Sequence, residues 1–371
     1  MNPDTAPPDA APNAAPDAPP DTPPHAASGA AISARARALP KVLLHEHLDG
    51  GLRVATLLDL LRERGVASPA PDAASLAAWF DANAHAGSLV KYLEGFALTV
   101  AAMASPAALR RVAFEAAEDA RTDGAVLAEF RIAPLLFEAH GLSGEVAVEA
   151  LLAGLADSPL PSGLIVCGMR HEPAFETQRA ARLALKYQGR GVVGFDLAGA
   201  EFGHPPADHA ATLKLVRDAG LPITLHAGEA DAAERVLEAG RLGAARIGHG
   251  VRLVDALRDP ARRGLVDEVL ALRLHLEVCP TSNVHTGAAA SVAAHPITEL
   301  WRAGVSLSYH TDNRLMSCIS LAGEAAALLT QTPLTEADLL AMAAQAARHS
   351  FLPAAQREAA LAAITAWPAS V

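Results

Sequence analysis

His45, His47 and Asp49 stand at alternate positions directly after a short apolar run that contains Val42 and Leu44. Side chains at alternate positions of a β-strand point to the same face, so the two imidazoles and the carboxylate are expected to lie in one row. Imidazole nitrogens and carboxylate oxygens are common ligands of a divalent ion such as Zn²⁺. The stretch therefore predicts part of a metal site, and the rest of the chain must complete it.

Short apolar runs of this kind recur along the chain and alternate with helical patterns. Eight of them are predicted as strands, at residues 42–44, 126–132, 164–169, 192–197, 223–225, 245–248, 274–278 and 305–308. Alternating strands and helices predict a parallel sheet of the α/β class, and eight such units predict a closed (β/α)₈ TIM barrel. Catalytic residues of such barrels lie at the carboxyl ends of the strands, and here a His or a carboxylate follows nearly every strand.

Four residues from the first, fifth and eighth predicted strands could hold one metal ion, namely His45, His47, His226 and Asp312. A catalytic ion of this kind lowers the pKa of a bound water, which then acts as a nucleophile near neutral pH. Glu229 could serve as a general acid, and His249, between two glycines, could orient or deprotonate the water. Taken singly, each His could be a core residue and Asp312 a helix cap. Their joint occurrence at strand ends favours a catalytic metal centre.

Two segments lie outside the alternation of strands and helices. Residues 1–36 are almost entirely Pro, Ala, Asp and small polar residues, which predicts a disordered tail, so the barrel is expected to occupy residues 37–371. Residues 52–120 are predicted as helical, including a run at 89–100 that Ser88 would cap. A helical insertion directly after the first strand is where a lid over the pocket would lie.

Composition narrows the classes of function. The 371 residues are 51% hydrophobic and 4% aromatic, with a formal net charge of −11. The acidic balance and the few aromatic residues argue against a nucleic-acid partner, and no apolar run approaches the roughly 18 residues of a membrane helix. Three widely spaced cysteines predict reduced, buried thiols. Because the N-terminus also lacks a secretory pattern, we expect a cytoplasmic protein, and nothing in the sequence specifies an oligomeric state.

The motifs at the strand ends resemble, in order, the signatures of the metal-dependent adenosine deaminase family of the amidohydrolase superfamily. The matching segments are His45-Glu46-His47-Leu48-Asp49-Gly50, Asp196-Leu197-Ala198-Gly199, His226-Ala227-Gly228-Glu229, Gly248-His249-Gly250, Glu277-Val278-Cys279-Pro280, Thr311-Asp312 and Ser350-Phe351-Leu352-Pro353. The HAGE and GHG motifs in this order are specific, whereas the HxH motif alone is not. The resemblance covers about residues 38–368, which is everything except the tail.

The resemblance implies an enzyme that hydrolytically deaminates adenosine, and also 2′-deoxyadenosine, to inosine and ammonia in purine salvage. One Zn²⁺ per chain would be bound by the four ligands named above. Glu229 would protonate purine N1, and His249 and Asp312 would position the oxygen that attacks C6. The substrate side of the site would be formed by His47, Asp49, Gly199 and Asn313. The resemblance does not extend to the small cytidine-type deaminases, because their PCxxC zinc motif is missing here.

Two residues depart from the family's Asn-Thr-Asp-Asp pattern, because this chain reads His310-Thr311-Asp312-Asn313. The second Asp of the family must be protonated to donate to purine N7, whereas the neutral amide of Asn313 is already a donor. The contact with N7 is therefore expected to persist. His310 in place of Asn has no evident role in the sequence.

Other functions remain open at the level of the sequence. Relatives of the adenine and aminofutalosine types tend to carry Glu near position 49, and those acting on N6-methylated adenine nucleotides carry Asn, so Asp49 favours adenosine or 2′-deoxyadenosine. A barrel kept only for binding would be expected to lose Glu229 or a metal ligand, and all of these are present. A general amidohydrolase usually needs a second metal and a bridging Lys, and no Lys lies at a predicted strand end.

Overall fold

The computed structural model describes residues 25–85 and 89–368. Eight strands run through this part of the chain: β1 (Lys41–Leu43), β2 (Ala125–Ile132), β3 (Ser162–Met169), β4 (Val192–Ala198), β5 (Thr224–Ala227), β6 (Arg246–His249), β7 (His275–Val278) and β8 (Ser306–Tyr309). They form two parallel four-stranded sheets, β1-β2-β3-β4 and β5-β6-β7-β8. All eight predicted strands are confirmed, with ends that differ by no more than two residues.

Two isolated bridges join the sheets into a ring. Phe195 in β4 pairs with Ile223 just before β5, and Glu46 after β1 pairs with Asp312 after β8, both in parallel. At the second junction the amide of Asp312 donates to the carbonyl of His45 (3.0 Å), and the amide of His47 donates to the carbonyl of Asp312 (2.8 Å). Closure therefore places the ends of the first and last strands side by side, as the predicted TIM barrel requires.

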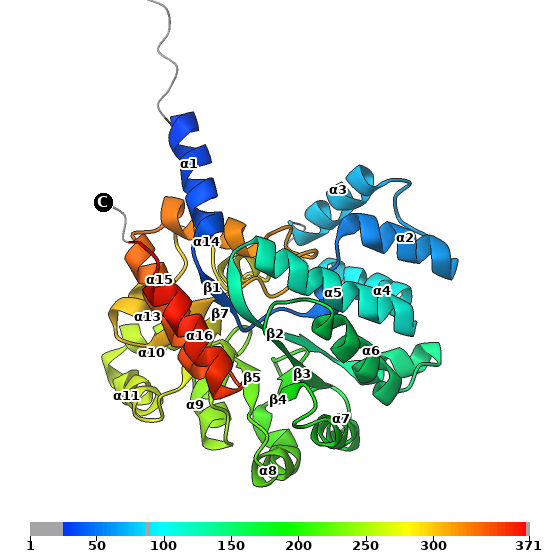
Figure 1. The fold of residues 1–371 in the computed structure, drawn as a ribbon. Helices are drawn as coiled ribbons and strands as arrows, with labels where there is room; N and C mark the ends of the chain where they lie inside the picture. Colours follow the sequence, from blue (N-terminus) through cyan, green and yellow to red (C-terminus); the bar gives the residue numbers. More distant parts are fainter. Residues whose placement is uncertain (1–24, 86–88, 369–371) are drawn as a thin grey trace, which may run out of the picture.

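Helices surround the strands (Figure 1). From the residues just before β2 to the end of the described chain, the helices are α5 (Pro106–Thr122), α6 (Gly144–Ala156), α7 (Ala174–Lys186), α8 (Ala210–Asp218), α9 (Glu234–Arg241), α10 (Leu253–Arg258), α11 (Arg263–Ala271), α12 (Pro280–His285), α13 (Ile297–Arg302), α14 (Leu321–Gln331), α15 (Glu336–His349) and α16 (Ala354–Thr365). Short 3₁₀ turns occur at Leu48–Gly50, Pro134–His140, Pro206–His209 and Pro260–Arg262. None of the helices in the described part of the chain combines the length and the apolar character needed to span a bilayer.

Local signals in the sequence explain where these helices begin and end. The side chain of Ser105 accepts a hydrogen bond from the amide of Ala108 at the start of α5, and Thr335 forms a capping box with Asp338 at the start of α15, both of which stabilise a helix N-terminus. Pro260 interrupts the long helical pattern after β6, because proline cannot donate within a helix. The pattern is accordingly divided into α10 and α11.

The helical insertion predicted after the first strand is present. It consists of α2 (Val54–Arg64), α3 (Ala73–Ala84) and α4 (Leu89–Met103), which lie to one side of the barrel in Figure 1. The predicted cap Ser88 lies outside the described residues. A role of the insertion as a lid stays a prediction.

Helix α1 (His25–Ala38) corrects the expected extent of the disordered tail, which we placed at residues 1–36. The helix lies beside α14 (Figure 1), Ala36 is fully buried, and Arg35 forms an ion pair with Glu336 (2.7 Å). The prediction treated the whole Pro- and Ala-rich stretch alike. However, Pro24 is its last proline before Pro40, so the alanines between them, which have the highest helix propensity, are free to form a helix. Residues 1–24 lie outside the described residues.

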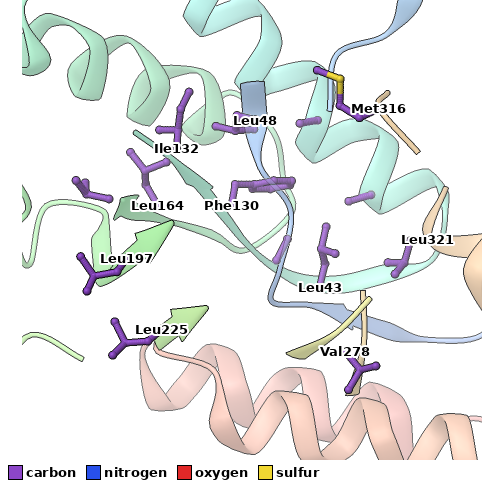
Figure 2. Packing of buried hydrophobic residues seen from close by; sticks show 14 of the residues in the cluster. Leu43, Leu48, Phe130, Ile132, Leu164, Leu197, Leu225, Val278, Met316 and Leu321 are labelled. Carbon is purple, nitrogen blue, oxygen red and sulfur yellow. The ribbon is translucent and has the colours of Figure 1, made fainter. Parts of the chain in front are cut away.

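One large apolar cluster fills the space between the strands and their helices. Figure 2 shows Phe130, Ile132, Leu164, Leu197 and Leu225 within it. Charged residues alternate with these apolar ones along β2 and occupy the interior of the barrel, where they form the buried network described below.

The prediction of buried cysteine thiols holds only in part, since two of the thiols are buried and that of Cys318 is exposed.

Candidate active site

The predicted metal ligands meet at the carboxyl ends of β1, β5 and β8, and His249 joins them from the end of β6. The ring centroid of His45 lies 4.7 Å from that of His226 and 4.9 Å from that of His249. By distance alone, one ligand atom from each of His45, His226, His249 and Asp312 falls within a group in which all atoms lie within 4.8 Å of one another, and all four residues are buried. His47 is not in that group, but its ring centroid lies 5.2 Å from that of His226.

The distances between individual donor atoms fit a small cation with four ligands. His45 Nε2 lies 3.3 Å and His47 Nε2 3.6 Å from Asp312 Oδ1, and His47 Nε2 lies 3.2 Å from His226 Nε2. Ligands of a tetrahedral Zn²⁺ at about 2.1 Å lie about 3.4 Å from one another. In addition, His45 Nε2 is buried without a hydrogen-bond partner in the described part of the chain. Such an unsatisfied nitrogen is what a metal ion would complete.

The ionisation states of the ligands also suit a cation. Burial lowers the pKa of His47 well below its ordinary value, and the neighbouring His226 and His45 add to this effect. For Asp312, burial by itself would raise the pKa of the carboxyl, but the close approach of His45 and the neighbouring His249 and His47 outweigh it and hold that pKa well below its usual range. A neutral imidazole and an ionised carboxylate are the forms that bind a metal.

The two glycines around His249 are required by the local backbone. A Cβ on Gly248 would lie 2.9 Å from Cε1 of His45, so any larger residue would push that ring out of the site. Gly250 has a left-handed backbone (φ 69°), and so do His249 (φ 65°) and Asp312 (φ 60°). This conformation is uncommon for residues with a side chain, and it occurs here at two of the predicted catalytic positions.

Carboxylates behind the site orient two of the histidines. His45 Nδ1 is 2.9 Å from Glu277 Oε2, and His226 Nδ1 is 2.9 Å from Asp196 Oδ2. Each imidazole therefore donates from Nδ1 and presents Nε2 to the centre, which is the common arrangement around metal-binding histidines.

Arg131 lies between these two carboxylates and binds both. Its guanidinium donates to Glu277 Oε2 (2.5 Å) and to Asp196 Oδ2 (2.8 Å), and all three side chains are fully buried. Burial would raise the pKa of Asp196, but His226 and Arg131 lower it below its ordinary value. Arg131 and Arg246 likewise hold the pKa of Glu277 well below its ordinary value against the effect of burial. Both carboxylates are therefore ionised.

The predicted general acid Glu229 lies in the loop after β5 and is half-buried. Its Oε1 accepts hydrogen bonds from Asn283 Nδ2 (3.0 Å) and Thr286 Oγ1 (2.8 Å), and its Oε2 lies 3.5 Å from His249 Nε2. The loop itself is held by Glu201, whose carboxylate accepts from four consecutive backbone amides, those of residues 228, 229, 230 and 231. Glu229 is thus fixed beside the cluster.

Comparison with known proteins decides the family. The family model described as adenosine deaminase matches residues 40–367. The chain belongs to the adenosine deaminase family. It is 43% identical, over 337 residues, to the adenosine deaminase of Mycobacterium tuberculosis (strain ATCC 25618 / H37Rv), which covers 86% of this chain and 92% of that protein. It is 41% identical over 341 residues to that of Mycobacterium avium (strain 104), with 86% and 93% covered. The prediction of a deaminating hydrolase is confirmed.

Solved structures of a deaminase and of an amidohydrolase share the fold of this adenosine deaminase family member. The N6-mAMP deaminase MAPDA of Arabidopsis matches with a TM-score of 0.78 and 25% identity, covering 90% of this chain and all of that one. A cog1816 amidohydrolase from Burkholderia ambifaria, solved with bound Zn, matches with a TM-score of 0.78 and 23% identity, covering 90% and 91%. The likeness in the second case concerns the fold.

The residues predicted for the substrate side line the same end of the barrel of this family member. Asp49 lies in the 3₁₀ turn Leu48–Gly50 and is buried. Burial raises its pKa to about 7, although its own backbone amide opposes the shift. Asp49 Oδ1 and Asn313 Oδ1 are buried without a hydrogen-bond partner in the described chain. Gly199 follows β4 directly. Their contacts with a substrate stay predictions.

His310, which departs from the family pattern, has a structural role at the junction of β1 and β8. Its Nδ1 accepts from the amide of Leu44 (3.1 Å), and its Nε2 lies 2.7 Å from Ser308 Oγ. Burial lowers its pKa well below the ordinary value, so the ring is neutral. It therefore bridges the two strands and does not enter the site.

Sequence reasoning missed two polar residues in α12. Ser282 Oγ donates to Asp312 Oδ2 (2.6 Å), and Asn283 contacts both Glu229 and His249. The available signal was their position directly after the predicted seventh strand, where a catalytic residue of a barrel is expected. Arg131 lies within the predicted strand 126–132, but its contact with two distant carboxylates could not be read from the sequence.

Proposed function

We propose that this chain catalyses the zinc-dependent hydrolytic deamination of adenosine, and of 2′-deoxyadenosine, to inosine and ammonia in purine salvage. The observation that carries the proposal is the buried group of histidines and Asp312 with Glu229 beside it. The relatives named adenosine deaminase, at 41–43% identity over 86% of the chain, support adenosine as the substrate. A cytoplasmic location and a small-molecule nucleoside as the partner belong to the same proposal.

The ligands that we assign to one Zn²⁺ are His45, His47, His226 and Asp312. Their donor atoms lie 3.2–3.6 Å apart where measured, and the unsatisfied Nε2 of His45 supports a cation at this point. A site with three imidazoles suits Zn²⁺ better than Mg²⁺ or Ca²⁺, which prefer oxygen ligands. When bound, the ion acts as a Lewis acid that lowers the pKa of water.

The side chains around the centre would carry out the remaining chemistry. Glu229 delivers a proton to purine N1, which makes C6 electrophilic. His249 and Asp312 hold the water whose oxygen attacks C6, and the ionised Asp312 can take a proton from it. The proton that Asp312 accepts passes to the amino group, which leaves as ammonia. The proton lost when the new C6–OH becomes a carbonyl returns to Glu229, so that one water is consumed for each inosine formed. Glu229 acts as acid and Asp312 as acceptor.

Asp49, Gly199 and Asn313 would select the substrate. The buried, unpartnered Oδ1 of Asp49 is suited to accept a hydrogen bond from a ribose hydroxyl, and a free base lacks that group. We place the amide of Asn313 against N7 and the backbone of Gly199 against the purine ring. These contacts favour a nucleoside over adenine.

The test follows the fall in ultraviolet absorbance as adenosine is converted, with and without a chelator, and compares adenosine with adenine, aminofutalosine and N6-methyl-AMP. Adenosine should be turned over fastest, and chelation should abolish its turnover. Fast turnover of one of the other three, without activity on adenosine, would overturn the assignment of substrate.

Glu229→Gln tests the role of the general acid. The kcat of the variant should fall by about 10²–10⁴-fold. Metal analysis should still find one zinc per chain, because Glu229 is not among the ligands. Glu234→Gln is the matched control, since Glu234 is an exposed residue that pairs only with Arg262 among the contacts described. An active Glu229→Gln enzyme would contradict the mechanism.

A further inference from the structure

A series of hydrogen bonds connects the buried His295 to the two catalytic side chains, Glu229 and His249. His295 Nε2 lies 3.2 Å from Asn283 Oδ1. Asn283 Nδ2 in turn lies 3.0 Å from Glu229 Oε1 and 3.1 Å from His249 Nδ1. Asn283 is fully buried and His295 is 4% exposed, so water does not compete for these contacts.

The backbone amide of Ile297 sets the donor and the acceptor of each hydrogen bond in this series. It can only donate, and it donates to His295 Nδ1 (3.1 Å), so that nitrogen carries no hydrogen. Burial lowers the pKa of His295 to about 3, and the neutral ring therefore carries its hydrogen on Nε2. That N–H donates to Asn283 Oδ1, which leaves the amino group of Asn283 pointing at Glu229 and His249.

The opposite orientation of the Asn283 amide is unfavourable at both ends. Its oxygen would then face the carboxylate of Glu229, and its amino group would face the N–H of His295. Only the first orientation pairs each donor with an acceptor. The orientation is thus selected by the contacts on both sides and not by a single distance.

For His249 the consequence is a defined tautomer. Its Nδ1 faces a donor and must accept, so its hydrogen lies on Nε2, the nitrogen 3.5 Å from Glu229 Oε2. A nitrogen that carries a hydrogen cannot bind a metal ion. Of His47 and His249, the second is therefore the donor that orients the attacking water, and His47 is left as the ligand.

For Glu229 the consequence is a defined position of the acidic proton. Oε1 accepts from the amino group of Asn283, which cannot itself accept, and from the hydroxyl of Thr286. The proton of the carboxylic acid therefore lies on Oε2, which is the oxygen on the side of His249 and the cluster. The acid is held in the orientation in which it can donate to a bound purine.

We propose that Asn283, held by His295, is a positioning residue that fixes the Nε2–H tautomer of His249 and directs the proton of Glu229 to Oε2. The kinetic consequences rest on the proposed deaminase function, whereas the tautomer does not.

The kinetic test compares one variant of Asn283 with two variants of His295. Asn283→Ala and His295→Leu should each lower kcat by about 10–100-fold, as loss of supporting hydrogen bonds does at metal sites, with little change in KM. His295→Gln should stay within a few-fold of the wild-type kcat, because its amide can both donate to Asn283 and accept from Ile297. Wild-type kcat in Asn283→Ala and His295→Leu would overturn the proposal, provided that the parent enzyme deaminates adenosine.

The tautomer is measured directly by ¹⁵N NMR of the zinc-loaded protein labelled at histidine, with the His249 signals assigned by their loss in His249→Gln. We expect the hydrogen on Nε2 in the wild type and on Nδ1 in Asn283→Asp, whose carboxylate can only accept. A wild-type ring with its hydrogen on Nδ1, or bound to zinc through Nε2, would overturn the proposal whatever the activity. An inactive wild type with the expected tautomer would instead refute the proposed function and leave the positioning role intact.

Discussion

Replacing Arg131 by Met measures how much the buried ion-pair network contributes to the free energy of unfolding, for comparison with an exposed ion pair. Arg131 donates to Glu277 (2.5 Å) and Asp196 (2.8 Å), and none of the three side chains is exposed. Arg131→Met keeps most of the side-chain volume but leaves two carboxylates without their shared cation. Removing one partner of a buried pair typically costs about 3–5 kcal/mol, because a charge stays buried without compensation.

The expected change in melting temperature follows from the size of the protein. The entropy of unfolding is about 2.1 cal/mol/K per residue, which gives about 0.7 kcal/mol/K for the ~340 residues described. A loss of about 3–5 kcal/mol therefore lowers Tm by about 4–7 °C. Calorimetry or circular dichroism in the presence of a chelator measures this without a contribution from metal binding.

Arg53→Met is the matched control. Arg53 also pairs with an Asp, Asp119 (2.6 Å), but 45% of its side chain is exposed. Exposed pairs contribute less than about 1 kcal/mol, so Tm should fall by no more than about 1–2 °C. If both variants lost the same small amount of stability, the view that Arg131 compensates two buried charges would be wrong.

Three further predictions concern pH, positioning and the metal. Burial raises the pKa of Glu324 from 4.5 to about 7, and the amide of Thr281 donates to its carboxylate (2.9 Å). Because the unfolded state releases this proton at a lower pH than the folded state does, stability is lost as pH rises toward about 7 and then levels off. The Tm advantage of Glu324→Gln over the wild type should therefore grow between about pH 5 and about pH 7 and level off above that, whereas the exposed control Glu63→Gln should show no such trend. Glu201→Ala removes the acceptor of four amides in the loop that carries Glu229, so kcat for adenosine should fall by about 10² with zinc content unchanged; an unaltered kcat would argue against positioning by this carboxylate. Chelation should lower Tm by about 4 °C if zinc was present at about 100 times its Kd, added Zn²⁺ should restore it, and an identical Tm with and without chelator would count against a structural contribution of the metal.

The sequence by itself determined the architecture of the barrel and the order of its motifs. Strand positions were recoverable because apolar runs and helical periodicity are local properties, and His45, His47 and Asp49 could be placed in one row from the period of a strand alone. The exception was α1, where a Pro-rich segment and the Ala-rich segment after it were judged by their combined composition. The helix begins directly after Pro24.

Only the tertiary structure decided how residues from different strands divide the chemistry. Barrel closure brings Asp312 to His45 and His47, and no local pattern records which strands become neighbours. The sequence assigned His47 to the metal and left open whether His249 orients or deprotonates the water, because a histidine's tautomer depends on the group that faces its other nitrogen. Here that group is Asn283, which lies 34 residues further along the chain. Hydrogen bonds between such distant residues exist only after the backbone has folded, and they decide on which nitrogen His249 carries its hydrogen.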